Sequence, residues 1–274
     1  MQLQLNKFDI TTITDDSVVV FIGKRRTGKS FLVRDVLYHN KDIPIGTLIS
    51  STEMANKYYG DMIPSLFIHD EYTAEIIENV TKRQKMIIKK INKEKEKHGH
   101  CRIDPRAFLI LDDCLFNNSW VRDKNVISIF LNGRHYKMLF MITMQYPLGI
   151  PPSLRTNLDY VFILRENNQS NRRRIYENYA GMIPSFELFN EIMDQCTENY
   201  ECLVLKVNAQ SNKLEDQIFW YKAEDHNEFK IGAKEFWAMH HANIGAESEN
   251  EDIELFDIRS VKKKRPNINI KKLY

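Results

Sequence analysis

The chain has 274 residues, of which 43% are hydrophobic and 28% are charged, and its formal net charge at pH 7 is +2. This length allows one sizeable core with a small appendage, and the hydrophobic content excludes a disordered chain. The near-neutral charge gives no reason by itself to expect nucleic-acid binding, which must depend on where basic residues cluster. The first residues lack the order of a signal peptide, and no apolar run approaches the roughly 18 residues that span a bilayer. We therefore expect a soluble intracellular protein without a membrane-spanning segment.

A buried strand, a glycine-containing loop and a helix follow one another near the start of the chain. Residues 17–22 are a continuous apolar, β-branched run, typical of a strand buried on both faces in a parallel sheet. From residue 29 to about residue 38, apolar residues fall at helical spacing. The octet between these elements matches G-x-x-x-x-G-K-[ST] at every specified position: Gly23, Lys24, Arg25, Arg26, Thr27, Gly28, Lys29 and Ser30.

This octet predicts a binding site for a nucleoside triphosphate such as ATP and for Mg²⁺, and by itself it leaves kinase, GTPase and motor ATPase open. Successive backbone N–H groups and the start of the helix face the β-phosphate, because these donors are unpaired and the helix dipole favours negative charge there. Lys29 is expected to reach the β- and γ-phosphates, and the Ser30 hydroxyl to ligate Mg²⁺. The alternative is a glycine turn with a surface lysine.

A long basic helix is predicted next, after a short strand at residues 47–51. Apolar positions between residues 72 and 91 trace one helical face. From Lys82 to Lys97 the chain has eight Lys or Arg residues against Glu94 and Glu96. Such a stripe can follow DNA phosphates without reading bases, and a solvated helix face is the alternative.

Two acids follow the apolar strand predicted at residues 107–111. Asp112 and Asp113 then lie at the carboxyl end of a parallel strand, where ligands bind in open α/β sheets. We expect Asp112 to hold Mg²⁺, directly or through water, and Asp113 to act as the base that polarises the attacking water. A solvated loop acid beside a magnesium ligand is the alternative for Asp113.

A third strand, predicted at residues 138–144, delivers Gln145 to the same crevice. Its amide is suited to sensing the γ-phosphate and orienting the water, and a strand-end cap is the alternative. Arg134 precedes this strand and is the candidate for an arginine finger that reaches a neighbouring subunit's nucleotide, with Arg155 as its rival. An ordinary surface or DNA-facing arginine remains an alternative for both.

The remaining elements complete an α/β fold. Residues 160–164 form a further strand candidate, and Arg172, Arg173 and Arg174 form a second basic cluster. Residues 202–207 and 217–222 alternate around a polar turn, which predicts a hairpin at one sheet edge. We expect a P-loop ATPase domain over residues 1–223 and a partly flexible extension over residues 224–274, which is acidic at 247–257 and basic at 261–274.

Several segments together resemble the poxvirus A32-like genome-packaging ATPases of nucleocytoplasmic large DNA viruses, a branch of the FtsK and HerA superfamily. They are GKRRTGKS at Gly23, FLILDDCLF at Phe108, FLNGRHYKMLFMITMQYPLGIPPSLRTNLDY at Phe130, IYENYAGMIPSFELF at Ile175, and YECLVLKVNAQ followed by IFWYKA. They cover residues 18–223 in family order, and the blocks GRHYK to TMQYP and ENYAG are more specific than the phosphate loop.

The resemblance implies a RecA-like core with a mostly parallel sheet flanked by helices, and an extra strand between the phosphate-loop strand and the magnesium strand. It also implies a homo-oligomeric ring that pumps double-stranded DNA into a capsid, with capsid proteins as partners, in the host-cell cytoplasm (the viral factory) and in the virion. The roles given to Lys29, Ser30, Asp112, Asp113 and Gln145 carry over by position. The second acid of the wider superfamily is usually glutamate, so Asp113 is one methylene shorter.

Three functional classes stay open at this point. A DNA translocase needs the acid pair, a strand-end glutamine and ring-forming arginines. A P-loop kinase needs an acceptor pocket and a lid, and a nucleotide-gated switch keeps Lys29 but loses the catalytic acid. A cellular HerA-type translocase shares the motor's chemistry, so only the family resemblance selects packaging.

Overall fold

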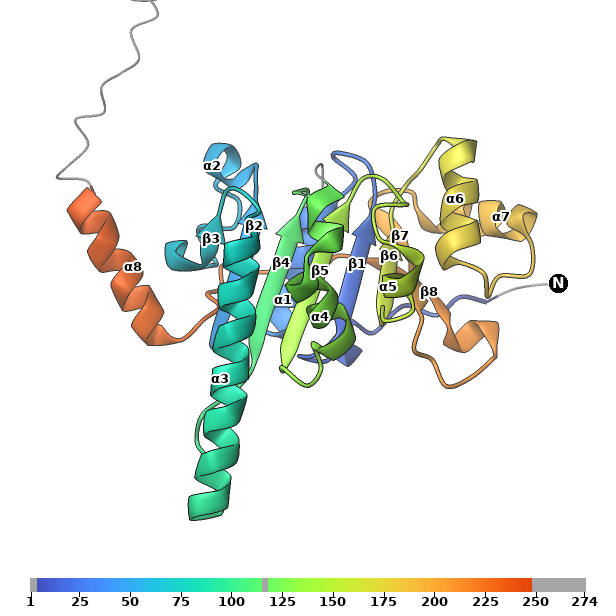
Figure 1. Cartoon of the computed structure of the whole chain (residues 1–274). Coiled ribbons are helices and arrows are strands. Elements are labelled where there is room, and N and C mark those ends of the chain that lie inside the picture. Colours follow the sequence, from blue (N-terminus) through green and yellow to red (C-terminus); the bar gives the residue numbers. More distant parts are fainter. Residues whose placement is uncertain (1–3, 115–117, 248–274) are drawn as a thin grey trace, which may run out of the picture.

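The computed structural model describes residues 4–114 and 118–247, which form a central sheet with helices on both faces (Figure 1). Eight strands form this sheet: β1 (Val18–Ile22), β2 (Ile45–Ser50), β3 (Ile68–His69), β4 (Ala107–Asp112), β5 (Met138–Met144), β6 (Tyr160–Ile163), β7 (Glu201–Lys206) and β8 (Ile218–Lys222). Within the described ranges, no helix combines the length and the apolar character needed to cross a bilayer.

The strand order is β3-β2-β4-β5-β1-β6-β7-β8. The first six strands of this order, from β3 through β1 to β6, pair with one another in parallel. Strand β7 pairs antiparallel with both β6 and β8, and β7 and β8 form the C-terminal hairpin at one edge. The predicted α/β class is therefore confirmed. Strand β5 lies between β1, which precedes the phosphate loop, and β4, which carries the acid pair, as the family resemblance implies.

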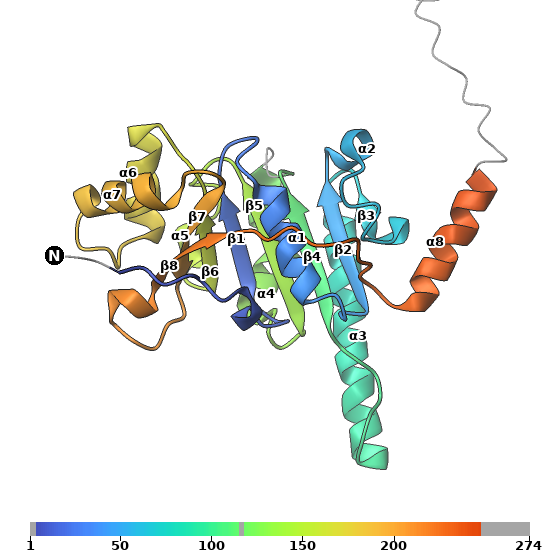
Figure 2. The ribbon, with the colours of Figure 1, turned by 180° about the vertical axis from the view of Figure 1, so that it is seen from behind.

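The sheet divides the hydrophobic core into two layers, and helices cover both of them. The helices are α1 (Lys29–His39), α2 (Glu53–Asn56), α3 (Ala74–His98), α4 (Lys124–Asn132), α5 (Pro152–Arg155), α6 (Gln169–Tyr179), α7 (Phe186–Cys196) and α8 (Lys234–Glu247), with short 3₁₀ turns η1 (Ile10–Thr12), η2 (Ser65–Phe67), η3 (Asn118–Arg122) and η4 (Leu214–Asp216). Helix α1 covers one face of the sheet (Figure 2), and α3, α4 and α5 cover the other.

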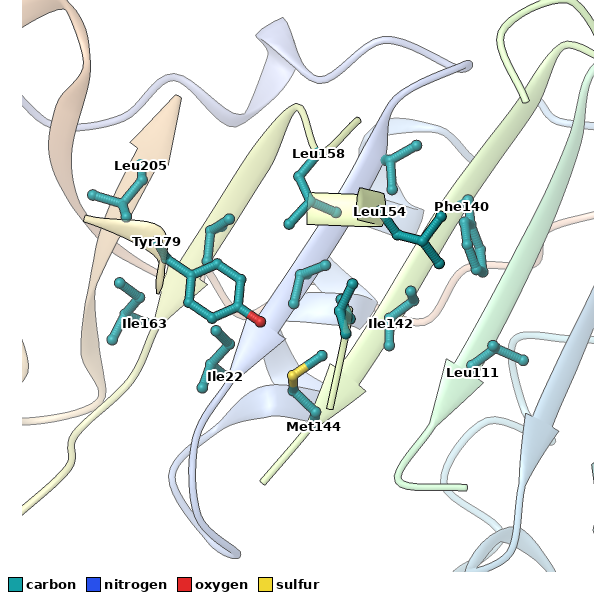
Figure 3. Packing of buried hydrophobic residues seen from close by; sticks show 14 of the residues in the cluster. Ile22, Leu111, Phe140, Ile142, Met144, Leu154, Leu158, Ile163, Tyr179 and Leu205 are labelled. Atoms are coloured by element: carbon teal, nitrogen blue, oxygen red, sulfur yellow. The ribbon is translucent and has the colours of Figure 1, made fainter. Parts of the chain in front are cut away.

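Alternating side chains of the strands supply the two layers, because successive residues of a strand point to opposite faces. Val18, Val20 and Ile22 of β1 belong to the layer under α3 and α4, and Val19 and Phe21 to the layer under α1. Figure 3 shows the first layer, in which side chains from several strands meet residues of α5 and α6. Burial of β1 on both faces explains why its sequence is continuously apolar.

Helix α3 begins and ends at clear capping signals. The Thr73 hydroxyl accepts a hydrogen bond from Ile76 N (3.3 Å), and Gly99 ends the helix with a left-handed φ of 76°. Its first half packs against the core, whereas its second half extends beyond the sheet (Figure 1). The helix is therefore longer than the stretch predicted from its apolar face.

The segment after β8 crosses back over helix α1. The buried Asp35 carboxylate accepts hydrogen bonds from the Tyr221 hydroxyl (2.6 Å) and from Glu224 N (3.0 Å), and His226 Nε2 lies 2.6 Å from its other oxygen. Residues just beyond 223 thus pack onto the first domain, and the division at that residue stays a prediction. The acidic and basic tail predicted beyond residue 247 lies outside the described residues.

Candidate nucleotide site

A cavity of about 620 Å³ opens where β2, β4 and β5 end and α1 begins. Residues from four segments of the chain line it: Arg25, Arg26, Gly28, Lys29, Ser30, Phe31, Ser51, Thr52, Glu53, Asn56, Tyr58, Tyr59, Asp112, Asp113 and Gln145. Five of the eight loop residues, the acid pair and the glutamine singled out in the sequence therefore meet at one place, although they lie up to about 120 positions apart. Gly23, Lys24 and Thr27 of the loop are not among the residues that line this cavity.

The phosphate loop has a compact form that depends on its two glycines. Gly28 has a φ of 105°, a left-handed conformation that glycine adopts at little cost. A Cβ placed on Gly23 would come within 2.7 Å of Thr27 Oγ1 and 2.8 Å of Leu164 Cβ, so only glycine fits there. Thr27 Oγ1 donates to Lys24 O (2.8 Å), which closes the loop on itself.

Contacts within the loop fix the Lys29 side chain. Its side chain is 6% exposed, and its ammonium donates to Gly23 O (3.0 Å) and Lys24 O (3.1 Å). The same nitrogen lies 3.5 Å from Asp113 Oδ2. Two of its three donors are therefore used to fix the ammonium to the loop, beside the Asp113 carboxylate.

Asp112 is a buried carboxylate with two hydroxyl neighbours on adjacent strands. Thr143 Oγ1 donates to its Oδ1 (2.7 Å), and Ser50 Oγ donates to its Oδ2 (3.3 Å). The strand register places these three residues side by side, since Asp112 pairs with Ser50 on β2 and with Thr143 on β5. Burial raises the pKa of Asp112 above the ordinary 3.8, because a charged carboxylate is costly where water is excluded.

Asp113 turns its side chain in a different direction from Asp112. Its backbone has a φ of 47°, which is uncommon for a residue other than glycine, and its N–H donates to Thr143 Oγ1 (2.9 Å). Its Oδ2 accepts a hydrogen bond from Gln145 Nε2 (3.2 Å) and lies 3.5 Å from Lys29 Nζ. Strained residues of this kind are held by their surroundings and cluster at functional sites.

The donor set suits a magnesium ion. The Ser30 hydroxyl and the Asp112 carboxylate line the same cavity, and both are hard oxygen ligands. Mg²⁺ is commonly held by one or two such groups together with water and substrate phosphates. A cation beside Asp112 would also compensate a carboxylate that burial leaves with an unfavourable charge.

The segment after β2 supplies site residues that sequence reasoning missed. The Glu53 carboxylate is buried and accepts hydrogen bonds from Tyr59 N (2.9 Å) and Gly60 N (2.8 Å), and its pKa is raised by burial. The Tyr59 hydroxyl faces Ser30 and Asp112 and has no hydrogen-bond partner among the described residues. The available signal was the polar run that follows the predicted strand at residues 47–51, at the edge where ligands bind.

Thr143 is a second omission, and it links the two aspartates. Its hydroxyl donates to the Asp112 carboxylate and accepts from the Asp113 N–H, so that one side chain fixes both acids. The signal was a polar residue inside the otherwise apolar strand at residues 138–144, where a buried hydroxyl requires partners.

The chain is similar in sequence to proteins of large DNA viruses. No protein-family model matches the chain. Over 240 residues, or 87% of its length, the chain is 42% identical to uncharacterized protein L437 of Acanthamoeba polyphaga mimivirus and covers 84% of that protein. Over 229 residues, or 80% of its length, it is 41% identical to uncharacterized protein 075L of Invertebrate iridescent virus 6 and covers 83% of it. The chain belongs to this family of viral proteins.

Family membership confirms the resemblance to the A32-like ATPases of large DNA viruses that the sequence blocks carry. Among solved structures, the genome packaging NTPase B204 from Sulfolobus turreted icosahedral virus 2, in complex with ATP-gammaS, superposes with a TM-score of 0.53 at 16% identity. The match covers 77% of this chain and 98% of B204. At this identity the likeness shows the fold alone, which is that of the P-loop ATPases.

Arg134 lies at the opposite end of β5 from the nucleotide cavity. It precedes the first residue of that strand, and its guanidinium pairs with Asp159, which is buried. Asp159 also accepts hydrogen bonds from Val18 N (2.8 Å) and Asn208 Nδ2 (2.8 Å). Within its own chain, this family member therefore uses Arg134 to compensate a buried carboxylate, and a role in a neighbouring subunit stays a prediction.

Arg155, the rival candidate, is engaged near α5 and α6. Its Nε donates to Ile150 O (2.7 Å), its guanidinium also bonds to Asn178, and it lies over the Tyr179 ring at 5.3 Å. It does not belong to the residues that line the nucleotide cavity. The contacts of both arginines lie within their own chain, and a role at a neighbour's phosphates stays a prediction for each.

Two residues of the predicted basic clusters, Arg83 and Arg172, are withdrawn from the surface in the structure. Arg83 of α3 is half-buried, and burial lowers its pKa to about 10. Arg172 of α6 is buried, with hydrogen bonds to Glu166 O (2.6 Å) and Asp194 Oδ1 (2.6 Å). Helical spacing places both near a basic face, and local sequence does not reveal that the folded structure buries them. The other basic residues of α3 that stay exposed are Lys82, Lys85, Lys89, Lys90, Lys93, Lys95 and Lys97.

Proposed function

We propose that this protein hydrolyses MgATP and uses the reaction to drive double-stranded DNA into a viral capsid. The observation that carries the proposal is the meeting of Lys29, Asp113 and Gln145 in one cavity beside the Ser30 and Asp112 oxygens. Nucleotide binding alone does not require the second acid and the strand-end amide. Viral relatives and the fold shared with a genome packaging NTPase support the biological setting.

Binding begins at the amides between Gly23 and Ser30. Backbone N–H groups at the start of α1 are unpaired donors, and the helix dipole adds a favourable field for phosphate. Lys29 is already anchored by two carbonyls, so little ordering of its side chain is required when the γ-phosphate arrives. Bound Mg²⁺ would neutralise charge that develops on the phosphate oxygens, and Ser30 and Asp112 would hold it.

Hydrolysis needs a water held in line with the γ-phosphate. The water oxygen attacks the γ-phosphorus, and the bond between this phosphorus and the ADP oxygen breaks. Asp113 accepts the proton that the water loses. Gln145 donates to the Asp113 carboxylate at 3.2 Å, so its amide oxygen is free to accept from the same water. Thr143 holds Asp112 and the Asp113 backbone in the relative positions that this division of roles requires.

A DNA translocase requires an oligomer and a surface that contacts DNA. We expect a homo-oligomeric ring in which Arg134 of one subunit approaches the nucleotide of the next, and in which the lysines of α3 follow DNA phosphates. The exposed half of α3 extends away from the body of the subunit (Figure 1), which suits contact with a polymer that runs past it. Capsid proteins are the expected docking partners, in the viral factory of the host-cell cytoplasm and in the virion.

One assay separates this function from its rivals. ATP hydrolysis by the full chain is measured with and without double-stranded DNA, and the proposal predicts Mg²⁺-dependent turnover that DNA stimulates. Transfer of phosphate to another molecule would instead indicate a kinase, and slow hydrolysis that DNA does not change would indicate a nucleotide-gated switch. Stimulation by DNA without uptake into capsids would leave the general HerA-type translocase.

A further inference from the structure

A second cavity of about 600 Å³ lies on the other side of the phosphate loop. Its lining comes from the loop, α1, the turn before β7 and the end of β8: Arg26, Gly28, Phe31, Tyr200, Lys222 and Ala223. Arg26, Gly28 and Phe31 also line the phosphate cavity, so the two spaces share one wall at the start of α1. A nucleotide whose phosphates occupy the loop can therefore extend into this second space.

The turn before β7 holds Tyr200 in an unfavourable left-handed backbone conformation. Glu201 N donates to Glu198 O (2.8 Å), which closes a β-turn. Its central residues, Asn199 and Tyr200, have φ values of 50° and 67°, so both are left-handed. This geometry is typical of a type I′ turn, where glycine and asparagine are preferred and tyrosine is not. Non-glycine residues held in this region cluster at ligand-binding sites.

The Tyr200 ring stands over the phosphate loop. A Cβ placed on Gly28 would lie 3.7 Å from Tyr200 Cδ1, which puts the ring in contact distance of that glycine. Tyr200 is 69% exposed and Phe31, the residue after Ser30, is 48% exposed. Two large aromatic side chains thus face solvent at the point where a bound triphosphate would continue into ribose and base.

We propose that this cavity binds the nucleobase of ATP, which stacks on Tyr200 with Phe31 as the second apolar wall. The inference rests on the proposed function, since it concerns the same nucleotide. Of the six lining residues in the described structure, Gly28 has no side chain, and none of the other five side chains is a carboxylate or an amide that would accept from the adenine amino group. The donors of Arg26 and Lys222 can serve ring acceptors of either purine. Stacking accepts any base, and purines offer the larger face. The site therefore favours purine nucleoside triphosphates and discriminates weakly between ATP and GTP.

The test compares ATP with inorganic tripolyphosphate, which has the phosphates but no base. Affinities of the full chain for both ligands are measured with Mg²⁺ for the wild type, Tyr200→Ala and Tyr200→Phe. Loss of one stacking partner is expected to weaken ATP binding about tenfold in Tyr200→Ala, to leave tripolyphosphate binding unchanged, and to be rescued in Tyr200→Phe. GTP is expected to bind the wild type within about fivefold of ATP, because stacking is sequence-tolerant.

The outcomes separate this inference from the proposed function. Equal weakening of ATP and tripolyphosphate in Tyr200→Ala would show that the ring only supports the loop at Gly28, and would overturn the base site. Unchanged ATP affinity would overturn it as well. If the wild type bound neither ligand, the proposed function itself would fail. Photolabelling with 8-azido-ATP gives a second readout in the wild type, with labelled peptides expected to contain Phe31 or Tyr200.

Discussion

The carboxyl edge of the sheet and the outer half of helix α3 build their chemistry in opposite ways. At the sheet edge, Ser50, Asp112 and Thr143 are buried, and each is hydrogen-bonded across a strand boundary. Along outer α3, lysines such as Lys89 and Lys90 are exposed and carried by local helical structure. The first region is preorganised by tertiary packing, whereas the second offers charge without fixed geometry.

This difference matches what each step of a motor requires. Phosphoryl transfer depends on positions fixed within fractions of an ångström, and buried hydrogen bonds supply that precision. Movement along DNA depends on contacts that form and break at any sequence, and exposed lysines supply those at little cost. Substitutions in the first region should therefore change turnover steeply, and those in the second should change it gradually and in a salt-dependent way.

The largest expected effect comes from Asp113→Asn. Removing a general base lowers turnover by about 10²- to 10⁴-fold, while MgATP affinity is retained because the loop and the metal ligands are untouched. Steady-state hydrolysis and ATP binding are measured on the same preparation. Asp225→Asn, at an acid that is 83% exposed and does not line the cavity, is the matched control and should hydrolyse ATP normally. A normal rate in Asp113→Asn would remove this residue from the mechanism.

Thr143→Val tests whether the sheet edge is preorganised by this hydroxyl. The change keeps the shape of the side chain but removes the donor to Asp112 and the acceptor for Asp113 N. We expect turnover about 10- to 100-fold lower, a higher Mg²⁺ requirement, and a loss of about 1 to 3 kcal/mol in the free energy of unfolding. Thermal unfolding and Mg²⁺ titration of hydrolysis report the two effects.

Thr47→Val is the control for this prediction. Thr47 is buried in β2, and no side-chain hydrogen bond is described for it. Its replacement should leave the Mg²⁺ requirement unchanged. If both variants shifted that requirement equally, the effect would belong to the sheet as a whole and the special role of Thr143 would be lost.

Replacing the α3 lysines sharpens the other side of the comparison. The variant changes Lys82, Lys85, Lys89 and Lys90 to Gln and leaves half-buried Arg83 in place. Basal hydrolysis should stay the same, while DNA-stimulated turnover at moderate salt falls about tenfold and the salt dependence flattens by up to about 0.9 in log–log slope for each lysine that contacts phosphate. The control variant changes Lys206, Lys213 and Lys234 to Gln. An equal loss of DNA-stimulated turnover in this control would refute the DNA-binding stripe, as would unaltered stimulation in the α3 variant.

The smallest effect concerns the pH dependence of stability near the phosphate loop. Burial would raise the pKa of Glu166, but the hydrogen bonds from Lys24 and Asn168 N lower it below the ordinary 4.5. A carboxyl with a lowered pKa in the folded state stabilises the fold above pH 4.5, and this contribution is lost as the pH falls through the lower value. Glu166→Gln should therefore cost about 1 kcal/mol at neutral pH and less in acid. A cost that is equal at both pH values would contradict this account, and denaturant unfolding at several pH values measures it.

The parts of the fold and site that could be predicted depend on short contiguous sequence motifs. The β1 run, the glycine-lysine octet and the acid pair are contiguous, and each is tied to one geometry by backbone chemistry. Glu53, Tyr59 and Thr143 were missed because their roles depend on which strands become neighbours. Arg83 and Arg172 were counted with the basic clusters for the same reason, since only tertiary packing decides which long basic side chain is buried.

The most direct test of the central claim is electron microscopy of the protein with double-stranded DNA and a slowly hydrolysed ATP analogue. The account predicts a ring in which the β- and γ-phosphates lie on the amides preceding Ser30, with Asp112 and Asp113 facing them from the neighbouring strand. A nucleotide bound away from this loop, or phosphates far from both carboxylates, would contradict it.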